Sequence, residues 1–110
     1  MAIPGRDVPA VLRDAAARGA RAAIVYSSGV DADEMAAAVR GTELRVLGPS
    51  SEGYVDWRRG IVATFAPAAE EQLARTASAA PAGRSLAIVS QSGGLGFAFS
   101  GRASAERLNR

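Results

Sequence analysis

The stretch Ala22-Ala23-Ile24-Val25-Tyr26-Ser27-Ser28-Gly29 decides the fold of this chain. Its five apolar residues run without interruption up to the Ser-Ser-Gly break. A short continuous apolar run is typical of a strand that is buried on both faces, as in a parallel sheet. The run therefore predicts a strand near 22–27. Leu44 to Leu47, closed by Gly48-Pro49, predicts a second parallel strand near 44–48.

Apolar residues at helical spacing lie on both sides of the first strand. Those before it are Val8, Val11, Leu12, Ala15 and Ala16. The two sets predict helices near 8–18 and 32–40, and Gly19 is expected to end the first of them. Ala2-Ile3, followed by Pro4-Gly5, is interpreted as the tail of an earlier strand. The order strand, helix, strand, helix, strand is the pattern of βαβ crossovers in a doubly wound sheet.

The second half of the chain changes character and is less regular. The expected elements are short strands near 54–57 and 61–65, a helix over 68–77, a linker over 77–84, a buried strand near 86–90 and a helix near 94–108. Together the two halves predict an α/β fold: an incomplete Rossmann-like or flavodoxin-like three-layer unit with a mostly parallel sheet.

Composition excludes several classes of chemistry. The chain has 110 residues, with no Cys and no His, and all 13 of its basic residues are Arg. Disulfides, Cys/His zinc sites, Ser-His-Asp or Cys-His catalysis, Schiff bases and a P-loop lysine are thereby excluded within this chain. The net charge is +2 and the arginines are scattered, which argues against nucleic-acid binding. No apolar run reaches the roughly 18 residues of a membrane span, so a cytoplasmic protein is expected.

A Ser/Gly turn, Ser90-Gln91-Ser92-Gly93-Gly94, lies between a predicted strand and a predicted helix. The first amides of a helix lack partners, and the helix dipole adds positive charge there, so such a turn can bind phosphate or carboxylate. A binding loop of this kind requires free amides at Ser92, Gly93 and Gly94. A tight turn with an N-cap explains the same residues equally well. A nucleophile elbow at Ser92 is excluded, because no His can act as its base.

Two further Ser/Gly loops follow the predicted parallel strands. They are Ser27-Ser28-Gly29 and Gly48-Pro49-Ser50-Ser51. Loops at the carboxyl ends of parallel strands line the ligand crevice of open α/β sheets. Their hydroxyls and amides are candidates to hold a ligand that bears phosphates or amides. Ordinary turn chemistry accounts for either loop alone.

Four segments in this order resemble the NDP-forming acyl-CoA synthetases, such as ADP-forming acetate–CoA ligase and the succinyl-CoA synthetase α subunit. They are VPAVLRDAAARGARAAIVYSSG, LRVLGPSSEG, ATFAP and LAIVSQSGGLGFAF. The resemblance covers nearly the whole chain. It implies that residues 1–80 form the C-terminal part of a CoA-binding Rossmann-like domain. Residues 81–110 would then begin a flavodoxin-like domain and stop short of its end.

The resemblance also implies a role for each of the three loops. Ser90, Gln91, Ser92, Gly93 and Gly94 would bind phosphate, whereas Pro4, Ser27, Ser28, Gly29, Gly48, Pro49, Ser50 and Ser51 would lie on the coenzyme A side. The family's motif Gly-Pro-Asn has Ser50 in place of Asn here. Its Gly-rich CoA turn, its phosphohistidine and its ATP-grasp part have no counterpart in this sequence.

The implied reaction converts acid, CoA and NTP to acyl-CoA, NDP and phosphate. This chain would be a fragment that supplies binding loops but no catalytic residue, no metal ligand and no ATP site of its own. Its partners would be CoA or another phosphate-bearing small molecule, together with the remaining synthetase domains or a second copy. The alternatives are a stand-alone CoA-binding, anion-binding or regulatory module without catalysis, and a decayed copy without function.

Overall fold

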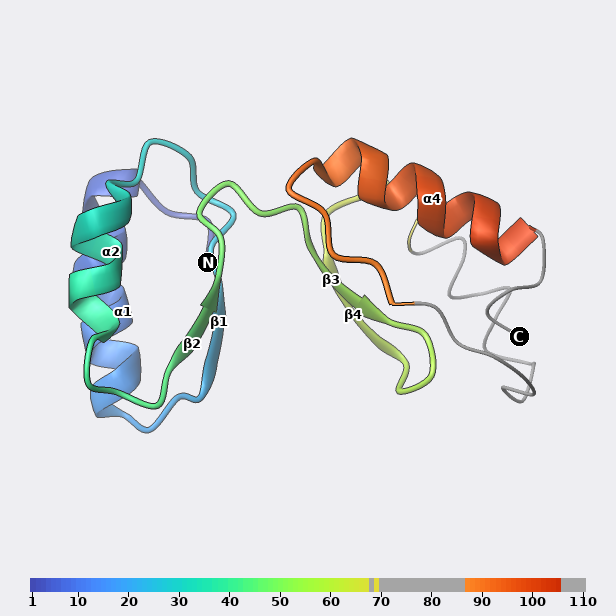
Figure 1. Cartoon of the computed structure of the whole chain (residues 1–110). Coiled ribbons are helices and arrows are strands. Elements are labelled where there is room, and N and C mark those ends of the chain that lie inside the picture. The colour runs from blue at the N-terminus through green and yellow to red at the C-terminus, as the bar shows by residue number, and fades with distance from the viewer. Residues whose placement is uncertain (68, 70–86, 106–110) are drawn as a thin grey trace. The chain divides into compact units, whose positions relative to one another are not determined.

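A computed structural model describes residues 1–67, 69 and 87–105 of the chain. These residues form an α/β fold with one parallel and one antiparallel pair of strands (Figure 1). The chain divides into two compact units, residues 1–51 and residues 52–110. Each unit is described by itself below.

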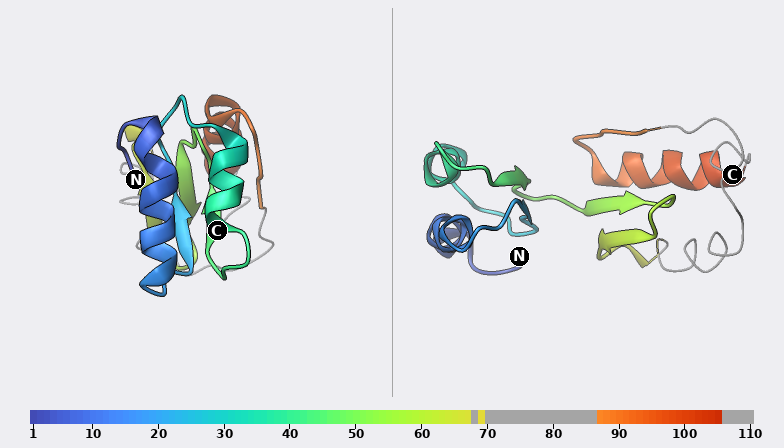
Figure 2. Two further views of the ribbon diagram at one scale, coloured as in Figure 1. Left: turned by 90° about the vertical axis from the view of Figure 1, so that its left-hand side faces the viewer. Right: turned by 90° about the horizontal axis from the view of Figure 1, so that it is seen from below.

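Unit 1 consists of helices that cover one face of a parallel strand pair (Figures 1 and 2). In chain order its elements are the 3-10 turn η1 (Gly5–Asp7), α1 (Val8–Ala17), β1 (Ala22–Ile24), α2 (Ala32–Val39) and β2 (Arg45–Leu47). The two strands pair in parallel, with Ala22 opposite Arg45 and Ile24 opposite Leu47. Since α2 joins them, they form the expected βαβ crossover.

Local sequence signals account for the ends of both helices in unit 1. Pro9 lies in the first turn of α1, where its missing N–H costs no hydrogen bond. The helix ends before Gly19, whose φ of +82° lies in the left-handed region that glycine favours. Asp31 caps α2, because its Oδ1 accepts hydrogen bonds from the amides of Asp33 and Glu34, both at 2.9 Å.

The core of unit 1 is small and entirely apolar. Val8 and Leu12 of α1, Val25 after β1, Ala38 of α2 and Leu44 before β2 are all at most 6% exposed. Val11, which shares the predicted apolar set of the first helix, is 40% exposed instead. Because the core has only five buried side chains, truncating any one of them should lower the free energy of unfolding of unit 1 substantially.

The first residue of the chain is hydrogen-bonded to the backbone of β1 and of the residues that follow it. The ammonium group of Met1 donates to the Ile24 carbonyl at 2.6 Å. The Tyr26 amide donates in turn to the Met1 carbonyl at 2.9 Å. This alternation is the pattern of a parallel ladder. The interpretation of Ala2-Ile3 as the tail of a strand is not confirmed, because no strand is present at these residues and both backbone bonds are made by Met1.

Unit 2 contains a β-hairpin and a helix. β3 (Gly53–Asp56) and β4 (Ile61–Thr64) pair antiparallel, and α4 spans Gly93–Ala105. The Trp57 indole N–H donates to the Ser100 hydroxyl at 3.4 Å, which joins the hairpin to α4. Large apolar side chains stay exposed in this unit, such as Phe65 at 63%.

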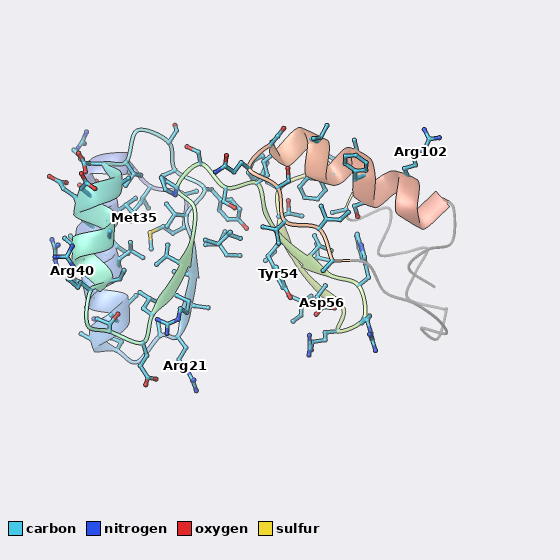
Figure 3. All side chains as sticks on the ribbon, in the orientation of Figure 1. Arg21, Met35, Arg40, Tyr54, Asp56 and Arg102 are labelled. Atoms are coloured by element: carbon cyan, nitrogen blue, oxygen red, sulfur yellow. The ribbon has the colours of Figure 1, made fainter. Side chains whose placement is uncertain are left out.

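Asp56 organises the tip of the hairpin. One of its carboxylate oxygens accepts from the amides of Arg58 and Arg59, at 3.0 and 3.1 Å. The other accepts from the Arg59 guanidinium at 2.8 Å and from the Tyr54 hydroxyl at 3.4 Å. Tyr54 and Asp56 are labelled in Figure 3. The bond from the Arg59 side chain, helped by the amide bonds and the Arg59 charge, lowers the pKa of Asp56.

The α/β class is confirmed, as are the helices near 8–18 and 32–40 and the start of the helix near 94–108. The strands near 22–27, 44–48, 54–57 and 61–65 are confirmed as well. The strand expected near 86–90 is wrong for residues 87–90, which form no regular structure and are exposed, Val89 fully so. An apolar run becomes a strand only where a neighbouring strand accepts its backbone bonds. Pro67 and Ala69 are helical, whereas the rest of the helix expected over 68–77, the linker over 77–84 and the expected boundary after residue 80 lie outside the described residues.

Candidate functional site

The structure joins the two loops that follow the parallel strands. The Ser50 amide donates to the Ser27 carbonyl at 3.0 Å, and the Ser51 amide donates to the Val25 carbonyl at 3.1 Å. Two of the three segments assigned to the CoA side therefore form one rim at the carboxyl end of the sheet. This is where open α/β sheets bind their ligands.

The backbone at Gly48 and Ser50 gives the second loop its shape. Gly48 has a φ of +117°, and a Cβ placed on it would overlap the Val25 carbonyl oxygen. The peptide bond between Gly48 and Pro49 is cis. Ser50 has a φ of +53°, which is uncommon for residues other than glycine and is several-fold enriched in Asn and Asp. The loop thus needs glycine at 48 and tolerates serine at 50.

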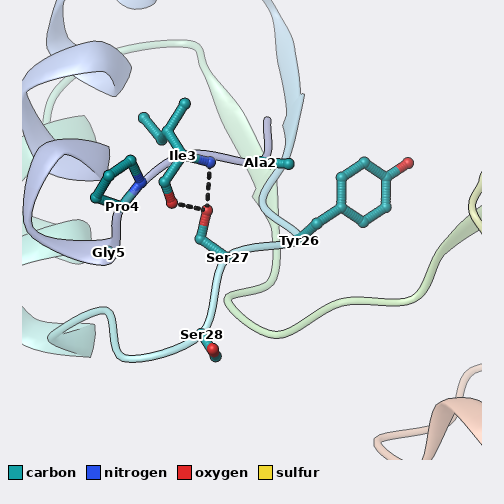
Figure 4. A pocket seen from close by; sticks show the side chains of 7 residues that line it. All are labelled: Ala2, Ile3, Pro4, Gly5, Tyr26, Ser27 and Ser28. Carbon is teal, nitrogen blue, oxygen red and sulfur yellow. Dashed lines mark hydrogen bonds between the residues drawn. The ribbon is translucent and has the colours of Figure 1, made fainter.

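Ser27 differs from the other loop residues because its side chain is buried. It is 9% exposed. Its hydroxyl donates to the Ile3 carbonyl at 2.6 Å and accepts from the Ile3 amide at 3.0 Å (Figure 4). Both hydrogen-bonding functions of this hydroxyl are therefore directed at the N-terminal segment.

An open pocket of about 530 Å³ lies between the N-terminal segment and the first loop (Figure 4). Its lining residues are Ala2, Ile3, Pro4, Gly5, Tyr26, Ser27 and Ser28. Three of the eight residues assigned to the CoA side, Pro4, Ser27 and Ser28, thus line one open pocket. Gly29 and residues 48–51 are not among the lining residues. None of the lining side chains is charged.

The predicted phosphate loop has a more closed geometry than expected. The Ser92 amide donates to the Ser90 hydroxyl at 3.2 Å, and that hydroxyl donates to the Ser92 carbonyl at 2.8 Å. The Ser92 hydroxyl accepts from the Leu95 amide at 3.4 Å and so caps α4. The expectation that the Ser92 amide is free is therefore wrong. The amides of Gly93 and Gly94 have no acceptor among the described residues.

A carboxylate lies beside this loop. A Cβ placed on Gly93 would overlap the side chain of Glu52, including its carboxyl carbon. Negative charge is favourable at the start of a helix, so Glu52 occupies the position that an incoming anion would seek. Arg102 is nine residues after Gly93 on α4, about 13 Å along the axis at 1.5 Å per residue. Its side chain points away from the ribbon (Figure 3), so it offers no counter-charge at the loop.

The predicted site residues did not include Glu52 or four of the residues that line the pocket, which are Ala2, Ile3, Gly5 and Tyr26. Tyr26 is the last apolar residue of the run that predicts the first strand, and it lines the pocket. Its place at the end of that run, at the carboxyl end of a strand, was the available signal. No sequence pattern indicated that Glu52 belongs to the site, because its spatial neighbour Gly93 is 41 positions further along the chain. Among the residues that the structure describes, no cluster of acidic side chains could hold a metal ion.

Searches of protein-family models, of curated proteins and of solved structures find no match for this chain. Within the described ranges no helix is long and apolar enough to cross a membrane.

Proposed function

We propose that this chain supplies the coenzyme A side of an NDP-forming acyl-CoA synthetase in the cytoplasm. One observation carries the proposal. Pro4, Ser27 and Ser28 line one pocket at the carboxyl end of a parallel strand pair. The Gly48–Ser51 loop is hydrogen-bonded to the same rim. The resemblance groups these three segments, far apart in sequence, around one ligand.

The conformation of Ser50 gives independent support. In the resembling family this position of the Gly-Pro-Asn motif is Asn. Asn populates positive φ more readily than most residues, and the φ of Ser50 is +53°. A backbone that favours Asn at this one position agrees with descent from a loop that carried it.

The Ser90–Gly94 loop has the second role in this proposal, as a weak phosphate site. The amides of Gly93 and Gly94 start α4 and have no acceptor among the described residues, which supports anion binding. The adjacent Glu52 side chain opposes it, because like charges repel in a partly desolvated site. Phosphate is therefore expected to bind here only weakly and in a salt-dependent way.

The chemical step lies outside these 110 residues. The sequence contains no His, so the phosphohistidine and the ATP site of the implied reaction would belong to other parts of a synthetase. The chain by itself would bind CoA without forming acyl-CoA from acid, CoA and ATP. Formation of acyl-CoA by the pure chain would contradict this assignment of roles.

A stand-alone CoA-binding or anion-binding module is the second candidate. One observation favours it: every residue that lines the pocket lies within unit 1, so ligand binding there needs no other unit. The reading frame around this chain distinguishes the two candidates. A neighbouring Gly-rich βα unit and a His-bearing ATP-grasp part would support the synthetase, whereas an isolated frame would support the module.

The direct test is an NMR titration of the full chain with CoA, with inorganic phosphate as the second probe. CoA should shift the amides of Ile3, Tyr26 and Ser28 most strongly. Phosphate alone should leave these amides in place, because no charged side chain lines the pocket. The proposal fails if CoA leaves the three amides unshifted or if its largest shifts lie in unit 2 alone.

A further inference from the structure

The N-terminal segment is held against β1 in two different ways. At Met1 the bonds run between backbone groups, to the Ile24 carbonyl and from the Tyr26 amide. At Ile3 the backbone ladder gives way to a side chain. The amide and the carbonyl of Ile3 both bond to the Ser27 hydroxyl, at 3.0 and 2.6 Å. One side chain thus takes the place of two backbone partners.

Burial makes this pair of bonds important. Ser27 is 9% exposed, and both bonds are partly buried. When a buried partner is removed, the groups left behind lose their hydrogen bonds without full access to water. Loss of the Ser27 hydroxyl would leave two backbone groups of Ile3 without a partner at once. Ser28, the next residue, is exposed, and its side chain points away from Ile3 (Figure 4).

A second close approach lies two residues further along the same segment. A Cβ on Gly5 would come within 2.6 Å of the Gly29 carbonyl oxygen and 2.7 Å of the Ser28 carbonyl oxygen. Those distances are too short for any real side chain, so residue 5 can approach the first loop this closely only as glycine. The N-terminal segment therefore meets the first loop at Ile3 and again at Gly5, and both residues line the pocket.

We infer that Ser27 and Gly5 are positioning residues that hold the N-terminal segment as one wall of the pocket, and that the Ser27 side chain does not bind the ligand. Its hydroxyl donates to the Ile3 carbonyl and accepts from the Ile3 amide, so it builds the cavity instead of contacting what fills it. The effect of this wall on CoA binding rests on the proposed function; the positioning role itself does not.

Hydrogen exchange of the Ile3 amide tests the positioning role on the full chain without any ligand. Ser27→Ala should speed this exchange on the order of tenfold, because both bonds at Ile3 are lost. Ser27→Thr keeps a hydroxyl and should restore slow exchange. The matched control, Ser28→Ala, should leave it unchanged. Unchanged exchange in Ser27→Ala would overturn the inference. So would equal acceleration in Ser27→Ala and Ser28→Ala.

Gly5→Ala provides the second variant, in case Ser27→Ala does not fold. It keeps the Ser27 hydroxyl but pushes the N-terminal segment away from the first loop, so it should also speed exchange at Ile3. Slow exchange at Ile3 in a folded Gly5→Ala protein would overturn the role of residue 5.

CoA titration of the same variants then tests what the wall does. The affinity for CoA should fall in Ser27→Ala and return in Ser27→Thr. Equal affinity in the wild type and in a Ser27→Ala variant with fast Ile3 exchange would overturn the wall's part in binding. If the wild type does not bind CoA, the proposed function fails, and the Ile3 exchange still decides whether Ser27 positions the segment.

Discussion

Replacing Gly48 by Ala adds one methyl group, but it should destabilise unit 1 far more than a change of that size suggests. Gly48 has a φ of +117°, and its added Cβ would overlap the Val25 carbonyl oxygen and lie 3.1 Å from the Val25 Cβ. Val25 is fully buried after β1, so it has no open space to move into. The substitution therefore strains the backbone and overfills the core at one point.

The magnitude follows from these two effects. Left-handed backbone costs a non-glycine residue about 1–2 kcal/mol. Overpacking a filled core costs a further ~1–3 kcal/mol. Gly48→Ala should then lower the free energy of unfolding by about 2–5 kcal/mol, a large part of the roughly 5–15 kcal/mol that a folded domain has.

Gly19→Ala is the matched control. Gly19 also has a positive φ, +82°, but a Cβ there meets nothing within 4 Å. It should cost only the backbone part, about 1–2 kcal/mol. Urea unfolding followed by far-UV circular dichroism measures both variants, with equal m values as the condition for comparing them. Equal losses in the two variants would refute the argument, because they would show that the approach to Val25 costs nothing.

Three further predictions concern the core, the hairpin tip and the loop before α4. Leu12→Ala should lower the free energy of unfolding by about 2–5 kcal/mol, and Val11→Ala by much less, because Leu12 is fully buried and Val11 is 40% exposed; similar losses in urea unfolding would contradict this. The Arg59 side chain lowers the pKa of Asp56. The Asp56 carboxylate and its hydrogen bonds at the hairpin tip are therefore fully present at pH values above the usual carboxyl pKa, and they are lost as the pH falls through the lowered pKa. A carbon-detected NMR titration should therefore show a higher pKa in Arg59→Ala, and an unchanged value would count against the Arg59 bond. Glu52→Gln removes the charge beside Gly93, so phosphate should shift the amides of 93 and 94 at lower concentration than in the wild type; no change would mean that Glu52 does not oppose the anion.

The elements that sequence predicted well are those whose signals are local. The helix near 8–18 was indicated by apolar spacing and by Gly19, and Val8 and Leu12 are indeed its fully buried residues. Spacing marks the apolar side of a helix but not its width, which is why Val11 was included and is partly exposed. The rim of the two parallel strands was predictable from topology, because loops at the carboxyl ends of adjacent parallel strands lie at the same edge of the sheet.

The parts that escaped prediction depend on contacts between distant residues. An apolar run such as 87–90 has the composition of a strand whether or not a partner strand is present. Nothing near Gly93 in the sequence indicates that Glu52 lies against it. Ser27 and Ser28 are identical residues in a row, and only the fold turns one toward Ile3 and leaves the other exposed.

The bonds between the two loops have a consequence for how this rim can evolve. Both run from backbone amide to backbone carbonyl, from Ser50 to Ser27 and from Ser51 to Val25. Exchange of the side chains at 28, 50 and 51 leaves those groups in place, provided that the residue at 50 accepts a positive φ. Selection can therefore alter the side chains of the rim while the backbone that presents them stays constant. A combinatorial library at these three positions is the natural starting point for directing the rim toward new small molecules.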